Sequence, residues 1–387
     1  MKRVAVLVLN EYVNDSRVIK QVESLSNKYA VDVFALNNGT FKELERSSTN
    51  VRVLRKVSYA KPSDFLLKKI KQAFVYFQYF ITSLLTLNKY DIVHCNDLET
   101  LPIGMLGKLF NRNLKVVYDA HEYETETLWM KNKFKKFLAR KLEGFLIHHA
   151  DGVCVVSEGI AKEYVRLYNI EKPYLVLNTP KLVTVAKTDI FREKFNIPKE
   201  TKIFLYQGGL TKGRGIEILL ESFCRLGDSR QVIVFMGYGH LENEVKKFAE
   251  SNDNIYFHEA VSPEVLLSYT SSADFGISFI EDLCLNYRYC LPNKIFEYMM
   301  TGIPVICSNL IEMKEVVNTH QLGLVANTND SQGFLECVKL SSSIDYVKLV
   351  EKVTLARTIF NWEQQEKVIF TTVSYNHLTL PTASQVE

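Results

Sequence analysis

The sequence predicts an α/β protein of two doubly wound domains that face each other across a cleft. The chain has 387 residues, enough for two compact domains with sizeable cores. Short β-branched runs alternate with longer amphipathic segments, an order typical of parallel sheets with crossover helices. The alternation restarts after residues 178–190, which have no helical period and contain a proline. Ligands of such domains bind at the carboxyl ends of the strands, so we expect the functional site there.

Short apolar runs are the predicted strands. In the first half they are residues 4–9, 31–36, 91–95, 115–119 and 153–156, and in the second half 202–207, 231–236, 254–258, 274–279 and 303–307. Residues 64–88 carry apolar side chains at intervals of three and four, which predicts a long amphipathic helix.

The domain boundaries follow from these runs. The first domain is expected to span residues 1–180 and the second 190–350. Residues 351–372 continue a helical period and are expected to cross back to the first domain. Residues 373–387 resemble translated adapter sequence, so we leave them out of the fold as a suspected non-native tail. A disordered terminus is the alternative.

The composition is that of a globular protein. Hydrophobic residues make up 47% and charged residues 24% of the chain, which excludes disordered, collagen-like and disulfide-scaffold proteins. The seven cysteines include no Cys-x-x-Cys pair, so neither a disulfide framework nor a zinc site is indicated, and we expect a reducing cytoplasm. The longest apolar stretch, residues 73–87, is interrupted by polar residues and is shorter than the roughly 18 residues that indicate a membrane span.

Charge is distributed unevenly along the chain. Residues 1–180 hold 27 lysines and arginines against 19 acidic residues, whereas residues 181–387 hold 20 against 25. This asymmetry suggests that one domain meets an anionic surface or substrate, although solvated surface charge explains it equally well.

Lysines gather with phenylalanines in two helical segments, residues 64–88 and 131–145. This pairing suits anionic lipid headgroups, and packing of the apolar stripe on the sheet is the alternative. We expect a cytoplasmic protein, with peripheral contact to the inner face of the plasma membrane as one hypothesis, and no nucleic-acid partner.

The strongest local signal is a glycine-rich loop after the strand at 202–207. It contains Gly208, Gly209, Lys212 and Arg214 and precedes an apolar-periodic helix. Free N–H groups at a helix start attract phosphate, and glycine lets the anion approach the backbone. Arg214 adds a permanent forked cation that can bind two phosphate oxygens. The loop therefore predicts a phosphate site, with a flexible turn carrying two solvated bases as the alternative.

A second signal lies around a predicted helix start at Pro292, with Glu297 about one turn further on. A carboxylate there can accept hydrogen bonds from the two neighbouring hydroxyls of a ribose. Asn293 and Lys294 can meet phosphate or sugar oxygens. A surface charge that complements the helix dipole is the alternative for Glu297.

In the first half, His121 follows the strand at 115–119, at the predicted cleft. A histidine there can hydrogen-bond a sugar hydroxyl or stabilise developing charge, and a loop-capping histidine is the alternative. At the neighbouring strand end, we expect Asp97 to be a helix N-cap and His94 to be a core residue.

The sequence holds no motif typical of a metal site, such as Asp-x-Asp or His-Glu-x-x-His, and no Ser/His/Asp elbow. Cationic side chains and helix dipoles are therefore expected to stabilise the negative charge that a divalent ion stabilises in other enzymes.

With these residues in order, the chain resembles glycosyltransferase family 4 over about residues 1–372. The resemblance rests on the order and spacing of several segments: NDSRVIK at 14–20, DIVH at 91–94, DAHE at 119–122, the loop at 208–215, GYG at 237–239, ADFG at 273–276, PNKIFEYM at 292–299 and GIPV at 302–305. It implies the GT-B fold, in which two Rossmann-like domains face each other across a cleft. It also implies a retaining, metal-independent transferase that uses nucleotide-sugar donors.

Positions of this sequence match the family's donor-side motif one residue at a time. Arg214 takes the position of the phosphate-binding lysine, while Gly209 stands where the family has an arginine. Lys212 or Lys294 is expected to supply the missing charge, by proximity in sequence.

The remaining motif positions concern the ribose and the acceptor. Glu297 matches the family's ribose-binding glutamate, but Tyr289 stands in place of the other glutamate of that pair. His121 matches the acceptor-side histidine near the reacting carbon. His121, Arg214 and Glu297 are thus the expected catalytic set.

The resemblance implies transfer of a sugar to an acceptor hydroxyl through a transition state with oxocarbenium character. The expected acceptor is a glycan or lipid-linked saccharide in capsule, exopolysaccharide or O-antigen synthesis, and no cofactor is expected. Two alternatives remain. An epimerase of the same fold would isomerise the donor without an acceptor, and a catalytically silent sugar-nucleotide-binding protein is favoured by Gly209 and Tyr289.

Overall fold

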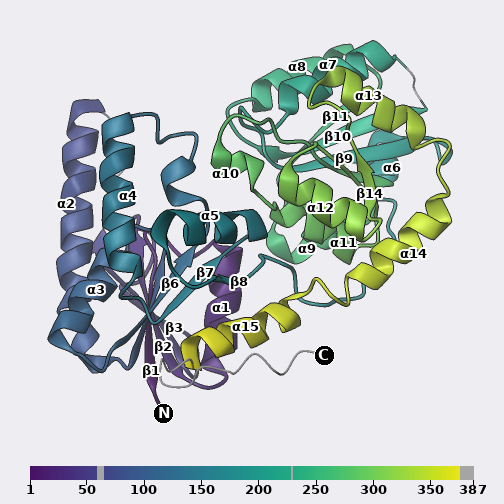
Figure 1. Cartoon of the computed structure of the whole chain (residues 1–387). Coiled ribbons are helices and arrows are strands. Elements are labelled where there is room, and N and C mark those ends of the chain that lie inside the picture. The colour runs from purple at the N-terminus through teal and green to yellow at the C-terminus, as the bar shows by residue number, and fades with distance from the viewer. Residues whose placement is uncertain (59–64, 228–229, 375–387) are drawn as a thin grey trace. The chain divides into compact units, whose positions relative to one another are not determined.

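The computed structural model describes residues 1–58, 65–227 and 230–374. They form two compact units, whose elements are labelled in Figure 1. One unit consists of Met1–Leu177 with the described residues from Gln365 on, and the other of Asn178–Gln364.

The first unit is built on a sheet in the order β3-β4-β2-β1-β5-β6-β7-β8. Neighbouring strands are parallel except β3 and β4, which pair antiparallel. The strands are β1 Arg3–Leu7, β2 Ala30–Asn37, β3 Leu44–Ser48, β4 Val51–Ser58, β5 Ile92–Asn96, β6 Lys115–Ala120, β7 Gly152–Val155 and β8 Tyr174–Leu175. Helices lie on both sides of this sheet (Figure 1): α1 Ser16–Ser26, α2 Phe65–Leu84, α3 Leu101–Phe110, α4 Lys133–Ile147, α5 Glu158–Tyr168 and α15 Trp362–Ser374, with 3-10 turns η1 Leu87–Lys89 and η2 Glu124–Glu126.

The central strands of this sheet read as apolar runs because helices cover both of their faces. Every residue of β5 is buried, as are the four residues of β1 after Arg3. The strand order changes direction between β1 and β5, so the loops that follow them diverge at the carboxyl edge. Asp97 and His121 follow β5 and β6 at that edge.

The second unit has a parallel sheet in the order β11-β10-β9-β12-β13-β14. Its strands are β9 Lys202–Gly209, β10 Gln231–Tyr238, β11 Ile255–Glu259, β12 Phe275–Ser278, β13 Val305–Cys307 and β14 Gly323–Val325. Its helices are α6 Ile190–Phe195, α7 Ile216–Leu226, α8 Glu242–Ser251, α9 Pro263–Thr270, α10 Leu285–Arg288, α11 Asn293–Met300, α12 Ile311–Thr319, α13 Ser331–Leu340 and α14 Tyr346–Ala356. Here the strand order changes direction between β9 and β12.

An aromatic core holds β9 and β12 together in the second unit. The rings of Phe204 and Phe275 stack with their centres 5.5 Å apart, and Phe223 of α7 meets Phe204 edge-on at 5.8 Å. All three side chains are fully buried. Burial of each such ring stabilises the fold by roughly 1.5–3 kcal/mol. The packed rings therefore hold β9 and β12 together at the point where the strand order changes direction.

The predicted strands are confirmed, each within a few residues of its expected ends, and the structure adds strands that the sequence did not predict. These are β3, β4, β8 and β14. All of β3 is exposed and two of its five residues are charged, so it lacks an apolar run, while β8 and β14 are too short to show a period. The predicted helix at 64–88 is confirmed as α2, which ends at Leu84.

The division of the chain differs from the expected one. The second unit begins at Asn178 and includes residues 351–364, which were expected to cross back. Helix α14 stays in this unit because the Tyr346 hydroxyl donates to the Asp274 carbonyl at 2.9 Å. The chain joins the first unit from Gln365, whose side-chain oxygen accepts from the Leu177 N–H at 2.9 Å. The suspected tail lies, from residue 375 on, outside the described residues.

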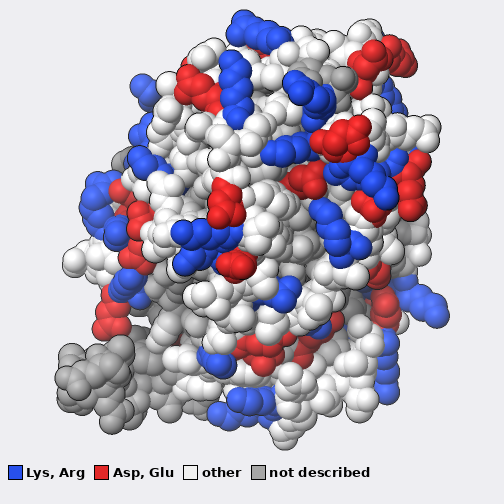
Figure 2. All heavy atoms as spheres, turned by 90° about the vertical axis from the view of Figure 1, so that its right-hand side faces the viewer, with Lys and Arg blue, Asp and Glu red and all other residues white. Residues whose placement is uncertain are grey.

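The surface charge is mixed on the face drawn in Figure 2. Acidic and basic side chains are interspersed there, without a large area of one sign. On this face an anionic ligand would meet individual cations rather than a broad field. Among the residues that the structure describes, no helix is both long enough and apolar enough to traverse a bilayer.

Candidate functional site

The loop after β9 exposes its backbone. Gly208 and Gly209 are exposed, and Gly208 has a φ of +118°. Gly215, with a φ of +73°, precedes α7, and a Cβ there would come within 2.4 Å of the Phe279 carbonyl oxygen. Glycine is therefore required at the helix start, and the loop can present its peptide groups directly to a ligand.

Arg214 brings a guanidinium to this loop. The side chain is half-buried, and its guanidinium carbon lies 5.1 Å from the centre of the Tyr287 ring. No carboxylate of a described residue lies within ion-pair distance of Arg214. Its charge is therefore available to an incoming anion, and the ring keeps the guanidinium oriented without neutralising it.

Lys294 lies in the first turn of α11, beside the same loop. Its Nζ is 3.8 Å from the centre of the Tyr206 ring, and a Cβ on Gly208 would lie 3.7 Å from that atom. Burial and the nearby charge of Arg214 lower the pKa of Lys294 to about 7, although Glu297 opposes them. The amine is thus only partly charged at neutral pH, and a bound anion would favour its protonated form.

Glu297 lies one turn further along α11 and is held by the end of β9. The Gln207 side-chain amide donates to Glu297 Oε2 at 2.5 Å. The Gln207 oxygen in turn accepts from the Thr270 hydroxyl at 2.8 Å. Glu297 is half-buried, so its carboxylate keeps a fixed direction while part of it stays accessible to a ligand.

The structure brings most of the predicted donor-side residues to one place in the second unit. Lys294 lies close enough to Arg214 and Glu297 for both charges to act on its pKa, and its amine lies beside Gly208. Gly209 follows at the end of β9. Lys212 and Asn293 have exposed side chains, and no hydrogen bond or ion pair with a described residue orients either of them.

Sequence reasoning missed Tyr206, Gln207 and Tyr287 in this site. Gln207 is a polar residue at the end of an apolar strand, which is a signal that could have been used. Tyr206 reads as an ordinary core aromatic, and Tyr287 lies in α10, a helix of four residues that shows no period.

In the first unit, His121 lies among polar side chains at the carboxyl edge of the sheet. Its Nε2 is 3.1 Å from Asn96 Oδ1 and 3.2 Å from Asp119 Oδ2, and its Nδ1 is 3.6 Å from Asp97 Oδ1. Burial lowers the pKa of His121, but Asp97 and Asp119 outweigh it and raise the pKa to about 9. The imidazole is therefore a cation at neutral pH, suited to stabilise negative charge rather than to remove a proton.

Asp119 is fully buried and held by α1. Arg17 donates to both of its oxygens, at 2.9 and 2.6 Å, and Gln21 donates to Oδ2 at 2.5 Å. Burial raises the pKa of Asp119, but Arg17 and His121 outweigh it and hold the pKa well below its usual value. No separate signal in the sequence pointed to Arg17 and Gln21, apart from the position of Arg17 in the segment NDSRVIK.

The expectation that Asp97 is a helix N-cap is wrong. Thr100 occupies that position of α3, and Asp97 adopts a left-handed backbone with a φ of 64°. Asp97 Oδ1 accepts a hydrogen bond from the backbone N–H of His121 at 3.3 Å, so the Asp97 carboxylate faces the loop that holds His121. His94 is buried in the core, as expected.

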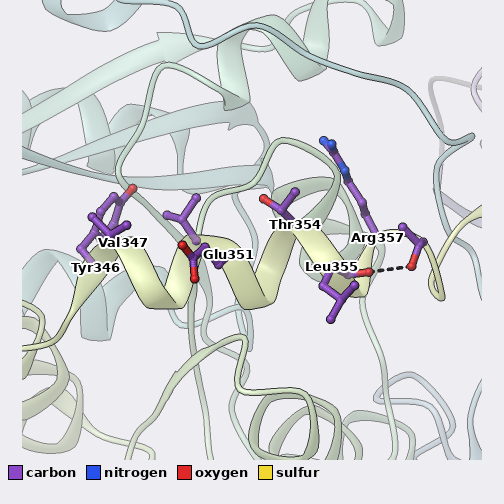
Figure 3. A pocket seen from close by; sticks show the side chains of 8 residues that line it. Tyr346, Val347, Glu351, Thr354, Leu355 and Arg357 are labelled. Carbon is purple, nitrogen blue, oxygen red and sulfur yellow. Dashed lines mark hydrogen bonds between the residues drawn. The ribbon is translucent and has the colours of Figure 1, made fainter.

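A hollow of about 630 Å³ along α14 is not a good candidate site. It is lined by Tyr346, Val347, Val350, Glu351, Thr354, Leu355, Arg357 and Thr358. Figure 3 shows the charged groups of Glu351 and Arg357 pointing away from one another, so no set of polar groups converges on a ligand. Within the described part of the chain, no group of His, Cys, Asp and Glu side chains is placed to hold a metal ion.

Known families match both halves of the chain. The family described as Glycosyltransferase Family 4 matches residues 17–178, and that described as Glycosyl transferases group 1 matches residues 201–340. Chitobiosyldiphosphodolichol beta-mannosyltransferase from Debaryomyces hansenii is 22% identical over 409 residues, which cover 94% of this chain and 85% of that protein.

Solved structures share the fold over nearly the whole chain. Sucrose-phosphate synthase from Thermosynechococcus elongatus is 17% identical with a TM-score of 0.75, covering 96% of this chain and 98% of that one. Anabaena HepE, solved in complex with UDP-glucose, is 15% identical with a TM-score of 0.73, and the match covers 97% of this chain and 100% of that one.

Proposed function

Because the chain belongs to glycosyltransferase family 4 and is a glycosyltransferase of the GT-B fold, we propose that it moves a sugar from a nucleotide diphosphate to an acceptor hydroxyl with retention. The observation that carries this proposal is the pair of cations at the glycine loop. Arg214 has no carboxylate partner among the described residues, and the amine of half-buried Lys294 lies beside the bare backbone of Gly208. A diphosphate supplies the negative charge that this arrangement leaves unbalanced.

The donor is proposed to bind with its diphosphate at the loop and its ribose on Glu297. The carboxylate that Gln207 orients can accept from both ribose hydroxyls. Lys294, rather than exposed Lys212, is proposed to supply the cation that the family has at the position of Gly209, because its amine lies beside Gly208. The structures of HepE with UDP and with UDP-glucose support a nucleotide-sugar donor.

In the proposed reaction the bond between the sugar and the diphosphate breaks as the acceptor oxygen approaches. Negative charge develops on the departing diphosphate, where Arg214 and protonated Lys294 would stabilise it without a metal ion. Preorganised groups of this kind contribute roughly 3–4 kcal/mol each to stabilising a transition state. His121, held as a cation by Asp97 and Asp119, is proposed to hydrogen-bond an oxygen of the acceptor.

The acceptor is proposed to be a lipid-linked saccharide of a surface-polysaccharide pathway. The name of the Debaryomyces hansenii relative describes transfer to a saccharide carried on dolichyl diphosphate, which supports this acceptor class. Exposed aromatic side chains on two helices of the first unit support it independently.

These side chains form what we call the apolar face: Phe74 and Phe77 of α2 with Phe134, Phe137 and Phe145 of α4. Each is more than half exposed, with Phe134 at 69%, and both helices pack on α3. Exposed Lys71, Lys133, Lys135 and Lys141 lie on the same helices. Aromatic rings beside lysines fit the headgroup region of an anionic bilayer, so we propose that the enzyme meets its acceptor at the inner membrane surface.

Titration calorimetry with UDP tests the donor site directly. Arg214→Ala should weaken UDP binding by about 10- to 100-fold, because a charge-assisted hydrogen bond to phosphate is worth about 1.5–3 kcal/mol. Lys212→Ala removes a cation of the same loop and should change the affinity by less than about threefold. Equal losses in the two variants, or no loss with Arg214→Ala, would reject the assignment.

A further inference from the structure

A groove in the first unit lies between α1 and the strands β3 and β4. Its volume is about 430 Å³, within the range of roughly 300–1,000 Å³ that is typical of small-molecule sites. The loop that follows β1 and the segment that precedes β3 complete its lining. The groove therefore has room for a small ligand.

Helix α1 separates this groove from the His121 site. Arg17 and Gln21 of α1 bind the aspartate of β6 that contacts His121. Glu23 and Ser26 of the same helix line the groove. With about 3.6 residues per turn, these two pairs of side chains lie on opposite faces of the helix. A ligand in the groove is thus held apart from the residues proposed to act in sugar transfer.

A buried guanidinium lines the groove on the side of the sheet. The side chain of Arg55 is only 4% exposed. Its Nη1 donates to Glu45 Oε2 at 2.6 Å, and its Nε donates to the Glu11 carbonyl at 3.2 Å. Within the described part of the chain, Nη2 has no hydrogen-bond partner. Because a guanidinium has five N–H donors, those of Nη2 are left for a group that enters the groove.

Two aromatic side chains line the groove together with Arg55. The centre of the Phe41 ring lies 4.7 Å from the Arg55 guanidinium carbon, and the Asn37 side-chain amide donates to the Phe41 carbonyl at 2.9 Å. On the loop after β1, the backbone N–H of Tyr12 donates to Asn10 Oδ1 at 2.8 Å. Both segments are therefore held in place before a ligand arrives, which lowers the entropic cost of binding.

Tyr12 has a strained backbone. Its φ is 58°, a left-handed conformation that bulky residues rarely adopt and that costs of order 1–3 kcal/mol. The Tyr12 hydroxyl makes no hydrogen bond with any residue that the structure describes. Strain of this kind is concentrated at ligand-binding sites, so the conformation and the hydroxyl both indicate that the ring serves a ligand.

The groups around the groove match the chemistry of a neutral sugar. The carboxylates of Glu23 and Glu45 can accept from sugar hydroxyls, Arg55 and Tyr12 can donate, and aromatic rings can pack on the apolar C–H face of a pyranose. Two carboxylates for one guanidinium disfavour an anion, and Arg55 disfavours a cation.

We propose that this groove is a second carbohydrate site, which binds a neutral saccharide between α1 and β4. Because α1 separates the groove from His121, the sugar held here is a different one from the sugar whose hydroxyl takes part in transfer. Binding at this site does not require the proposed transfer reaction.

Saturation-transfer NMR on the full chain tests the site with the methyl glycosides of glucose, galactose, mannose and N-acetylglucosamine. At least one glycoside should receive saturation from the protein. Tyr12→Asn should weaken its binding by about tenfold or more, because the ring is lost. Asparagine tolerates the left-handed backbone, so the Tm of this variant should equal or exceed that of the wild type. Phe110→Asn, which removes a 79% exposed ring at the end of α3, is the control and should bind the glycoside normally.

Glu23→Gln is a second variant, which leaves the buried Arg55 undisturbed because Glu23 lies on the exposed side of α1. It should weaken binding by about three- to tenfold through the loss of a charged acceptor. His121→Gln and Arg214→Ala should bind the glycoside like the wild type, whether or not either residue acts in transfer.

Four results would overturn the second carbohydrate site. They are the absence of saturation transfer to all of the glycosides, binding that survives Tyr12→Asn, loss of binding in His121→Gln, and displacement of the glycoside by inorganic phosphate. The third would place the sugar at the transfer site, and the fourth would identify an anion site at Arg55.

Discussion

Gln207 and Glu297 are joined by a hydrogen bond of 2.5 Å from the glutamine amide to the glutamate carboxylate. The other end of the amide accepts from the Thr270 hydroxyl at 2.8 Å, so Gln207 cannot flip without losing that bond. The bond connects the end of β9 to α11, the two elements that also bring the glycine loop to Lys294. A strand end thereby sets the direction of the proposed ribose-binding group.

Gln207→Leu should weaken UDP binding by about tenfold, because the Glu297 carboxylate loses its orienting donor. Glu297→Gln should have at least as large an effect. Calorimetry with UDP measures both, and Gln231→Leu is a matched control, since that glutamine bonds the exposed Ser342 hydroxyl on the other side of the unit. Unchanged UDP affinity in both Gln207→Leu and Glu297→Gln would contradict the proposed contact between Glu297 and the ribose.

Lys294 should make donor binding depend on pH. Burial and Arg214 lower its pKa to about 7, and Glu297 opposes them. Above that pH the free protein holds a neutral amine that must take up a proton to bind diphosphate. UDP affinity should therefore fall as the pH rises from 7 to 9, by up to about tenfold per pH unit.

Lys294→Arg isolates this effect because arginine stays charged throughout that range. Its UDP affinity should be nearly flat with pH, whereas Lys212→Arg should keep the wild-type slope. The same slope in wild type and Lys294→Arg would show that another group takes up the proton.

His121 should stabilise the folded protein in a pH-dependent way. Although burial alone lowers its pKa, Asp97 and Asp119 raise it from 6.5 to about 9 in the folded state. The stabilisation is therefore fully present below pH 6.5 and is lost as the pH rises through about 9. Its size is on the order of 3 kcal/mol at most.

Denaturant unfolding of wild type and His121→Gln across that pH range measures the contribution. The wild-type advantage in free energy of unfolding should shrink steadily with rising pH. For His148→Gln, which changes an exposed histidine on the end of α4, the difference from wild type should stay small and constant. A pH-independent gap for His121→Gln would mean that its charge does not contribute.

The apolar face should bind anionic membranes. Phe134→Ser with Phe137→Ser should lower the fraction that sediments with vesicles containing phosphatidylglycerol, by roughly tenfold in partition coefficient or more, because two exposed rings no longer enter the headgroup region. Lys133→Ala with Lys135→Ala should weaken binding by about 1 kcal/mol per lysine, and added salt should do the same.

Val347→Ser with Leu355→Ser is the matched control, since these side chains of α14 are also exposed, at 69% and 63%. That double variant should sediment like wild type. Equal losses from α4 and α14, or no sedimentation of wild type at low salt, would count against membrane contact through the apolar face.

The strands and the glycine loop could be predicted because their causes are local. Apolar runs mark buried parallel strands, and Gly215 is required by a backbone φ that other residues rarely adopt. Strand β3 could not be found in this way, because it is exposed and is held by pairing with β4. The same limit applies to Gln207 and Asp97, whose roles depend on partners that lie far away in the sequence.

The sequence alone determined that the chain alternates strands and helices twice, and that Arg214, Lys294, Glu297 and His121 follow strand ends or open helices where ligands bind. Those features depend on residue type and on neighbours a few positions away. Only the tertiary structure decided the charge and direction of these groups. Lys294 is brought beside Arg214 in a buried place, which lowers its pKa, and His121 is set between two carboxylates, which raises its pKa. Electrostatic energies depend on distance and desolvation, and both are fixed only when remote segments pack together.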